Sequence, residues 1–495
     1  LRLGRLLFER RYYDEAVSHL EAAVSDTTGG DATEAAFLLA QALVAIDRRD
    51  ALLHKHIPRH GDRAFSIFSQ ISTNAKDSEF ADDAVFKSLE IKHPAAIDTA
   101  AARSRIDVFE QFLKSHPNSN KQDDARLIQA ETHLDLSSRL PDHLEQALAI
   151  YKGIITRHKS GNYAEKARYG VGRCLAIKRD YIKAENALRA FLFEFPNSDL
   201  EEEARFQLGL ILLERGYLQS AAEEFAELLA APTSVDLERS TRALLAECYF
   251  RLEDFASAIS IDETLLDRGA EPAVLKRLGE AYTRTGNEEK ALSVLGTFVR
   301  KFSASQGADT LSFKRAELLA QLGRTDQAID AFKTLSTTFP TSKLTADGMA
   351  SVARLEFQKE NYTAALDAIP ESAGLKNEII GELRIVTLLR LDRTKQARKE
   401  TKTFKKKFPK QVEALARFQV EEARVQLRYG NPKKAKKTLE GVIKNYTQSQ
   451  SAGDAEFYLI DAIEKVGKPD EHLDALVSFV KNRSGNIYWA KANMA

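Results

Sequence analysis

The segment Ala167–Pro196 reads ARYGVGRCLAIKRDYIKAENALRAFLFEFP, and the segment Ala204–Leu229 reads ARFQLGLILLERGYLQSAAEEFAELL. Both predict a helix, a short turn and a second helix. Each has a glycine in the middle of its first helix, Gly172 in one and Gly209 in the other. In each, an alanine follows twelve residues after the glycine, and leucine or phenylalanine stands four and seven residues beyond that alanine. The two segments are therefore copies of one helical unit.

The alanine of this unit recurs along most of the chain. The recurring positions are Ala147, Ala184, Ala221, Ala258, Ala291, Ala328, Ala365, Ala397 and Ala435. Successive members are 37, 37, 37, 33, 37, 37, 32 and 38 residues apart. A tetratricopeptide repeat (TPR) is a helix–turn–helix unit of about 34 residues, so the spacing predicts an array of such units, many with slightly longer connections.

Other recurring residues resemble those of the TPR family, and the resemblance covers essentially the whole chain. They are Gly172, Gly209 and Gly279, with Ala130, Ala246, Ala316, Ala353 and Ala423 in the equivalent place, Tyr249 and Tyr282 three positions later, and Pro196, Pro340 and Pro409 after the second helix. The resemblance implies an all-α fold, a right-handed alpha-alpha superhelix (TPR solenoid) of about thirteen helix pairs. It also implies that first helices line a concave groove and second helices face outward.

Each recurring residue has a physical role. Glycine or alanine lets the two helices of a unit approach closely, and the side chains four and seven positions after the packing alanine share one helical face that fills the space between units. Proline ends the second helix because it cannot continue the hydrogen-bond ladder. In Phe195–Ser198 (FPNS) and Phe339–Ser342 (FPTS), the polar residue after the proline is expected to cap the next helix.

On this register the chain contains thirteen units. Their first helices are predicted to begin near residues 1, 33, 82, 123, 165, 202, 239, 272, 309, 346, 378, 416 and 453. We expect irregular units with insertions over residues 1–160, a regular array over 161–370 and basic units over 371–495. Because Leu3 and Gly4 fit the middle of a first helix and Ile487–Ala495 resembles the start of another, we expect the chain to be part of a longer array.

Three units depart from the pattern. The second contains an insertion with His54, His56 and His60, which could bind a metal ion, although the absence of a nearby cysteine and the surrounding arginines favour ordinary surface residues. The third has Arg105 where the packing alanine should stand. In the tenth, Pro370 predicts a kink or a shortened second helix, which is either a tolerated deletion or a hinge.

The composition argues against several classes of protein. The chain has 495 residues with 72 Lys and Arg against 72 Asp and Glu, and this neutrality argues against a dedicated nucleic-acid binder. Its two cysteines, Cys174 and Cys248, are too few for a disulfide scaffold and are interpreted as small buried residues. No apolar run approaches the roughly 20 residues that a membrane-spanning helix needs. Phosphate-loop, zinc-protease and nucleophile-elbow motifs are missing, so the sequence predicts no enzymatic activity, no cofactor and no metal.

One TPR specialisation can be tested on the sequence. TPR units that grip a C-terminal carboxylate resemble one another in a lysine at the fifth position of a first helix and an asparagine at the ninth. Lys276 matches the lysine, but Glu280 occupies the ninth position of the same helix and would repel a carboxylate. The sequence therefore argues against this specialisation.

Overall neutrality conceals a local separation of charge. Residues 197–263 contain 15 Asp and Glu against 5 Lys and Arg, whereas residues 376–446 contain 20 Lys and Arg against 8 Asp and Glu. The basic stretch is either a solvated face or a docking surface for an anionic partner such as an acidic protein, an acidic polysaccharide or lipid headgroups. We call its candidate residues the basic patch: Lys395, Arg398, Lys399, Lys402, Lys405, Lys406, Lys433, Lys436 and Lys437.

The absence of catalytic motifs and the repeat architecture together predict a non-catalytic scaffold that binds other proteins. The units with 37-residue spacing and Phe-Pro-x-Ser turns resemble those of bacterial cell-envelope TPR proteins of the outer-membrane assembly lipoprotein and Tol-Pal-associated types, which implies a periplasmic or envelope location. Two alternatives remain open, a TPR arm of a larger enzyme or sensor and an electrostatic binder of polyanions. Sequence-specific binding of nucleic acid is not expected because no groove-reading motif is present.

Overall fold

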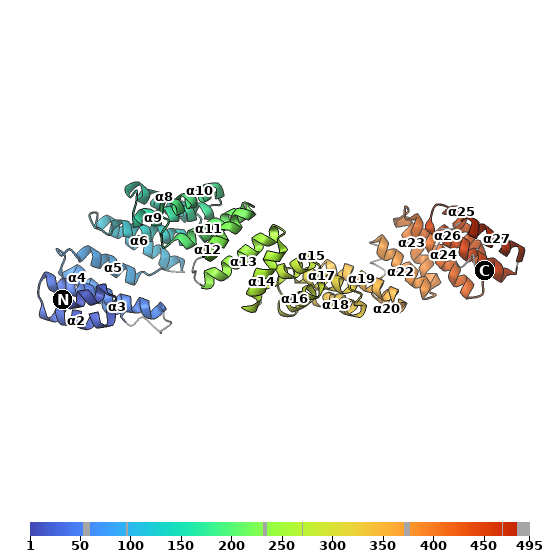
Figure 1. Cartoon of the computed structure of the whole chain (residues 1–495), viewed down its shortest axis with the longest axis horizontal. Coiled ribbons are helices and arrows are strands. Elements are labelled where there is room, and N and C mark those ends of the chain that lie inside the picture. Colours follow the sequence, from blue (N-terminus) through green and yellow to red (C-terminus); the bar gives the residue numbers. More distant parts are fainter. Residues whose placement is uncertain are drawn as a thin grey trace. The chain divides into compact units, whose positions relative to one another are not determined.

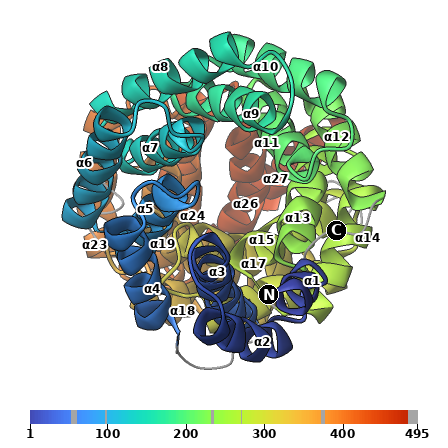
Figure 2. The ribbon, with the colours of Figure 1, turned by 90° about the vertical axis from the view of Figure 1, so that its left-hand side faces the viewer.

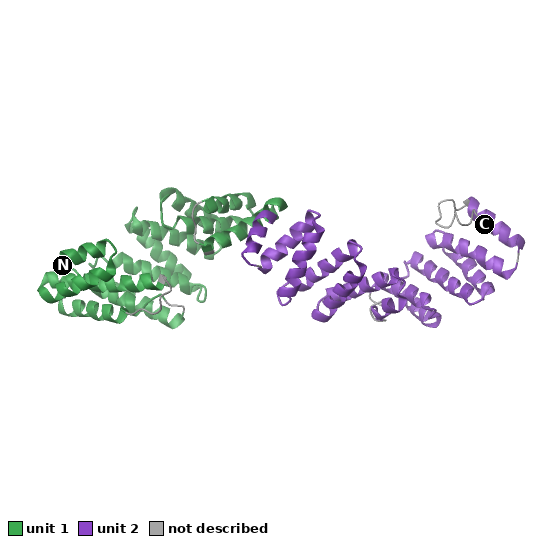
Figure 3. Ribbon diagram, turned by 60° about the horizontal axis from the view of Figure 1, so that its bottom comes forward, with its two compact units in different colours: residues 1–258 green, residues 259–495 purple. Residues whose placement is uncertain are grey.

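The chain folds into a succession of helices. The computed structural model describes residues 1–52, 60–95, 98–230, 235–269, 271–370, 377–467 and 469–482. Within these ranges twenty-six helices follow one another, and every regular element is a helix (Figure 1). The predicted all-α fold of stacked helix pairs is confirmed. The chain divides into two compact units, unit 1 over Leu1–Ala258 and unit 2 over Ile259–Ala495 (Figure 3).

Unit 1 contains the first thirteen helices. They are α1 (Arg2–Glu9), α2 (Tyr13–Asp26), α3 (Gly30–Leu52), α4 (Gly61–Asn74), α5 (Ala81–Lys92), α6 (Thr99–Ser115), α7 (Gln122–Leu136), α8 (Asp142–Arg157), α9 (Asn162–Ile177), α10 (Tyr181–Glu194), α11 (Glu201–Glu214), α12 (Leu218–Ala230) and α13 (Val235–Arg251).

The division between the units falls within α14, and the remaining helices belong to unit 2. They are α14 (Phe255–Asp267), α15 (Pro272–Arg284), α16 (Glu288–Lys301), α17 (Ala308–Gln321), α18 (Thr325–Thr338), α19 (Leu344–Gln358), α20 (Tyr362–Asp367), α22 (Glu378–Arg390), α23 (Thr394–Lys407), α24 (Val412–Arg428), α25 (Pro432–Asn445), α26 (Gln450–Val466) and α27 (Pro469–Asn482).

The predicted register agrees with the structure. First helices are the odd-numbered helices up to α19, followed by α22, α24 and α26. They begin at residues 2, 30, 81, 122, 162, 201, 235, 272, 308, 344, 378, 412 and 450, each within four residues of its predicted start. The regularity and charge of the repeats predicted a division of the chain at residues 160 and 370. The two compact units are instead defined by contacts between residues, so they do not test that division, which stays a prediction.

Close packing at the small residues explains why the register could be read from the sequence. A Cβ atom added to Gly209 would come 2.5 Å from Phe225 Cε1, and one added to Gly172 would come 2.6 Å from Leu188 Cδ2. Phe225 and Leu188 are completely buried. The leucine or phenylalanine four residues after the packing alanine therefore lies directly against the glycine of the preceding helix, where a larger residue cannot fit.

The ends of the helices follow two rules. Many first helices are followed by a residue in the left-handed region, such as Gly216 with φ of 80° and Arg179 with φ of 62°. At Gly216 this conformation carries no Cβ penalty, and it allows the reverse turn into α12. Second helices end before the Phe-Pro dipeptides as predicted, since α10 ends at Glu194, before Pro196, and α18 ends at Thr338.

The serines after these prolines do not cap the next helix, which corrects the sequence-based expectation. Ser198 Oγ accepts a hydrogen bond from the backbone N–H of Leu200 at 2.9 Å, and α11 starts with no side-chain cap. The same hydroxyl donates to Glu165 at 2.5 Å, and Ser342 likewise donates to Asp309 at 2.6 Å. Each serine thus shapes the turn before a first helix and links it to the first turn of the preceding first helix.

First helices form the inner row of each unit. In unit 1, α7 contacts α9 and α9 contacts α11, and Figure 2 shows these three helices inside α8, α10 and α12. In unit 2, α22 contacts α24 and α24 contacts α26 in the same way. Because helices on the inside of a curved stack must lie closer together, second helices occupy the outer side, as the resemblance implied.

The irregular third pair has a physical cause. Arg105 of α6 stands in place of the packing alanine, and Leu89 of α5 stands where other units have glycine or alanine. With two large residues at the point of closest approach, α5 and α6 make far fewer contacts than the helices of the neighbouring pairs. Arg105 instead donates a hydrogen bond to the carbonyl oxygen of His93 and lies over the ring of Phe109.

The other two predicted irregularities have different outcomes. The second helix of the tenth pair, α20, has 6 residues and ends at Asp367, so the shortened helix before Pro370 is confirmed. Residues 371–376, which follow it, lie outside the described residues. His54 and His56 of the insertion also lie outside them, as does Ile487–Ala495.

Candidate partner-binding surfaces

The inner row of unit 1 presents charged side chains that the fold does not pair. Glu131 and Asp135 of α7 lie near Lys166 and Arg173 of α9, close enough to interact electrostatically. Among the described residues, none of these four side chains has an ion-pair or hydrogen-bond partner. Tyr169 lies among them, with the Arg173 guanidinium 5.9 Å from its ring centre.

Glu131 lies at the surface in an environment that disfavours its charged form. Its side chain is exposed to solvent, yet protein atoms surround it. Burial among these atoms raises the pKa of Glu131 above its ordinary value, and the positive charges of Lys166 and Arg173 oppose the rise. A carboxylate in this position is only partly hydrated, so a cationic group of a partner would find it ready to form an ion pair.

The inner row of unit 2 is closed by its own contacts to a greater degree. Lys314 of α17 forms an ion pair with Glu280 of α15 at 3.0 Å, which joins two adjacent first helices. Burial raises the pKa of Glu317, which lies on the next turn, while Arg354 and Lys314 oppose the rise. Lys276 and Glu280, the two residues compared with the carboxylate-gripping units, therefore do not act together, because Glu280 is already paired.

The basic patch lies on second helices of unit 2. Its members are on α23 and α25, both of which pack against α24. Two members have intramolecular partners: Arg398 Nε donates to Glu422 at 2.8 Å, and Lys436 forms an ion pair with Glu471 of α27. Lys399 is also engaged within the chain.

The remaining members of the basic patch are open to solvent. In the described part of the chain, six exposed lysines of the patch have no ion-pair or hydrogen-bond partner: Lys395, Lys402, Lys405, Lys406, Lys433 and Lys437. Their charges are therefore available to an anionic partner on the outer side of the array. That such a partner exists stays a prediction.

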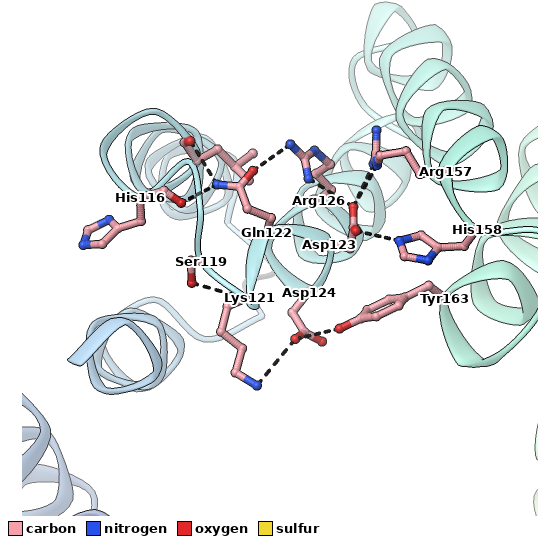
Figure 4. Close-up of polar contacts among 11 residues, drawn as sticks. His116, Ser119, Lys121, Gln122, Asp123, Asp124, Arg126, Arg157, His158 and Tyr163 are labelled. Carbon is pink, nitrogen blue, oxygen red and sulfur yellow. Dashed lines mark hydrogen bonds and ion pairs between the residues drawn. The ribbon is translucent and has the colours of Figure 1, made fainter. Parts of the chain in front are cut away.

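The densest polar network belongs to the fold. Asp123, in the first turn of α7, accepts hydrogen bonds from His158 at 2.6 Å, from Arg157 at 2.9 Å and from Arg126 at 3.0 Å (Figure 4). Burial acts to raise the pKa of Asp123, but these partners outweigh it and hold the pKa below its ordinary value. Tyr163 donates to the adjacent Asp124 at 3.0 Å. The network joins the α7–α8 pair to the start of α9.

A comparison with protein families matches one of the units. The sequence model of the tetratricopeptide repeat family matches residues 310–342, which span α17, α18 and the turn that ends at Ser342. This segment carries Ala316, Ala328 and Pro340, the small residues and the proline that recur in the other units. Residues 310–342 are thus similar to a tetratricopeptide repeat. This match supports the coarser part of the sequence-based identification, whereas the cell-envelope resemblance stays a prediction.

Comparisons with whole proteins find no curated sequence relative, and they find solved structures with low sequence identity. No curated protein matches the sequence. The structure is similar to a tetratricopeptide repeat protein from Parabacteroides merdae, with 15% identity, a TM-score of 0.35, and coverage of 54% of this chain and 98% of that one. The C-terminal part of a TPR repeat-containing protein from Cytophaga hutchinsonii gives 15% identity, a TM-score of 0.39, and coverage of 55% and 98%. A structure of Naa15/Naa10 bound to HypK-THB gives 13% identity, a TM-score of 0.30, and coverage of 99% of this chain and 81% of that one.

The cysteines and His60 of the array have structural roles. Cys174 and Cys248 are completely buried, as predicted, and burial raises the pKa of the Cys174 thiol to about 11. His60 uses its backbone N–H to donate to Asp47 at 3.1 Å. Within the described residues, no three His, Cys, Asp or Glu side chains gather as a metal site would require. Over the same ranges no helix has the length and apolar character needed to cross a membrane.

Sequence reasoning missed the unpaired charges of the inner row. Glu131 and Arg173 each directly follow the small packing residue of their helix, Ala130 in α7 and Gly172 in α9, and sequence reasoning did not compare them. The signal that could have found the pair is an opposite charge at one position in consecutive first helices. The repeat pattern does not distinguish such a pair from charges that the fold neutralises.

Proposed function

We propose that this TPR array is a scaffold that binds a partner protein along the inner row of first helices in unit 1. The observation that supports the proposal is the set of unpaired charges on α7 and α9 around Tyr169. Much of the charge elsewhere on the array is paired within the chain, and an unpaired, partly dehydrated charge gains most from a complementary partner. The expected partner segment has both acidic and basic residues and an apolar side chain for the aromatic ring.

Charge reversal on α9 tests this proposal. The variant Arg173→Glu should lose a partner that the wild-type chain captures from the source cell, because it places a third negative charge beside Glu131 and Asp135. Lys152→Glu, at an exposed position of the outer helix α8, makes the same change in net charge and should retain that partner. Equal capture by both variants would exclude the inner row as the binding surface.

Photo-crosslinking locates the partner independently of charge. A photoreactive amino acid at Tyr169 should crosslink to the captured protein. The same amino acid at Phe193, which is 88% exposed on the outer helix α10, should not. Crosslinks from Phe193 alone would place the partner on the outer side.

We also propose that the complex belongs to the bacterial cell envelope. The support is the resemblance in repeat spacing and in the Phe-Pro-x-Ser turns. Fractionation of the source cell should then recover the chain and its captured partner in the periplasmic or envelope fraction. Recovery of both in the cytoplasmic fraction would reject the location without affecting the scaffold.

A second binding surface is supported by the six unpaired lysines of the basic patch. We expect wild-type protein to be retained on heparin, a polyanionic probe, and to be released as salt rises, because the contact is electrostatic. The variant with Lys395, Lys402, Lys433 and Lys437 replaced by Glu should lose this retention. It leaves the ion pairs of Arg398 and Lys436 intact.

A matched control separates the patch from net charge. Lys76, Lys152, Lys301 and Lys343 are exposed lysines outside the patch, and their replacement by Glu changes the net charge by the same amount. This control variant should stay on the column. If both variants elute together, the basic patch is an ordinary solvated face.

A further inference from the structure

Arg315 places a positive charge at a position that several other units fill with apolar side chains. It directly precedes Ala316, the small packing residue of α17. The equivalent positions in four other first helices hold buried aliphatic residues: Leu208, Leu245, Leu278 and Val352, none more than 6% exposed. A guanidinium in this environment loses hydration that it must regain from another polar group.

The fold supplies no such group. The Nε atom of Arg315 is buried and has no hydrogen-bond partner, and within the described residues the side chain forms no ion pair. It lies against Gly296 of α16, where an added Cβ would come 3.4 Å from Nε. Arg300 is close enough to act electrostatically on it, and burial together with this charge lowers the pKa of Arg315. Two cations thus lie near each other, and among the described residues neither forms an ion pair.

Polar residues at the same position in other units are satisfied. Gln129 of α7 donates to the carbonyl oxygen of Ile106 on the preceding second helix at 3.2 Å. Glu422 of α24 accepts from Arg398, which is also on the preceding second helix. The position therefore faces the second helix before it, and Arg315 is distinguished by meeting there a glycine and another arginine.

Arg315 borders a cavity of about 280 Å³ between α16, α17 and α18. Its wall combines hydroxyl and amide groups with apolar side chains: Ser312, Gln327, Thr334, Thr338, Val299 and Phe339. Asp330 also lines it but forms no ion pair with Arg315. The cavity is distinct from the inner-row residues Lys314 and Glu317 of α17, neither of which lines it.

We propose that Arg315 binds a carboxylate group in the cavity between α16, α17 and α18. A guanidinium matches a carboxylate with two parallel hydrogen bonds, and the apolar part of the wall suits the carbon atoms that carry the group. Asp330 on the wall opposes a doubly charged phosphate more strongly than a singly charged carboxylate. The source, which rests on the proposed scaffold function, is an acidic side chain or the C-terminus of a partner protein.

Binding of a minimal carboxylate tests the site without any partner. We would follow trifluoroacetate by ¹⁹F NMR with the full chain and measure how far the protein accelerates its transverse relaxation. Arg315→Leu restores the aliphatic residue of the neighbouring units and should reduce the acceleration at least about threefold, since it removes the only bidentate donor. Arg315→Gln, which keeps a polar neutral group, should do the same.

The control is Arg393→Leu, which removes an exposed arginine of unit 2 that does not line the cavity. It should leave the relaxation unchanged. Equal acceleration in the wild type and in both Arg315 variants would overturn the proposal. Thermal unfolding of each variant shows whether it is folded, and the leucine variant should be at least as stable as the wild type because it removes a buried Nε–H that has no hydrogen-bond partner.

Displacement of trifluoroacetate identifies the source of the carboxylate. N-acetylalanine presents a C-terminal carboxylate, N-acetylglutamate amide presents a side-chain carboxylate, and N-acetylalaninamide presents neither. Displacement by either acid at matched ionic strength, and not by the neutral amide, supports the site and shows which source fits. Stronger displacement by inorganic phosphate than by both acids would overturn the carboxylate assignment. Because no partner protein takes part, these results are independent of the capture experiment with Arg173→Glu.

Discussion

Replacing Asp262 with alanine should destabilise the contact between α14 and α15 by about 3–5 kcal/mol, because it leaves a buried guanidinium without its counter-ion. Asp262 is completely buried, and Arg277 is 7% exposed. The carboxylate accepts two hydrogen bonds from the guanidinium, from Nε at 2.8 Å and from Nη2 at 2.6 Å. Hydrogen exchange of amides in α14 and α15 measures the effect, since a solenoid opens locally and each contact contributes to its own neighbourhood.

The double variant separates the loss of a partner from the value of the pair. Changing Asp262 and Arg277 together to leucine should recover most of the lost stability, because apolar residues often replace a buried ion pair without penalty. Asp326→Ala breaks an exposed ion pair with Lys359 in the same unit and should cost no more than about 1 kcal/mol. An equal loss from Asp262→Ala and Asp326→Ala would contradict the assigned burial.

Asp262 also marks a limit of prediction from the sequence. It stands four residues after Ala258, at the position where the repeat places leucine or phenylalanine, so the pattern alone marks it as an exception without explaining it. In the sequence it counts toward the acidic stretch, and Glu400 counts against the basic one. In the structure both are buried and paired, Glu400 with Arg384 at 2.9 Å. The net charge of a stretch of sequence therefore does not equal the charge that the stretch presents to solvent.

The fold could be predicted because its determining contacts are local. Gly172 and Leu188, like Gly209 and Phe225, are separated by 16 residues of helix–turn–helix, and the contact repeats with the period of the sequence. Sixteen residues is short enough for the pattern to specify both partners. Arg105 was recognised as a departure for the same reason, although its hydrogen bond to the carbonyl of His93 required the actual course of the chain before α6.

The candidate sites could be predicted less well, because they depend on which charges lack a partner. The repeat register assigns the basic patch to second helices, because its residues lie around Ala397 and Ala435, and they do lie on α23 and α25. It could not show that Arg398 and Lys436 are engaged within the chain while Lys395 and Lys433 are not. Pairing between units depends on side-chain reach across the stack, which the repeat period does not encode.

Phe225→Ala should cost about 3–5 kcal/mol of local stability, as expected for a completely buried aromatic side chain. The more informative test couples it to Gly209. Gly209→Ala should be destabilising by about 1–3 kcal/mol in the wild type, because its Cβ would come 2.5 Å from Phe225 Cε1. In the Phe225→Ala background the ring is gone, and the same change should stabilise α11 by up to about 1 kcal/mol through helix propensity.

This change of sign is the decisive result, because no account based on helix propensity alone produces it. Gly441→Ala provides the control: Gly441 lies within α25, and an added Cβ would meet nothing within 4 Å. It should stabilise its helix by about 0.5–1 kcal/mol. Hydrogen exchange in α11 and α12 measures the cycle. If Gly209→Ala behaves like Gly441→Ala in the wild type, the ring of Phe225 does not lie against Gly209, and the register that places the small residues at the helix crossings is wrong.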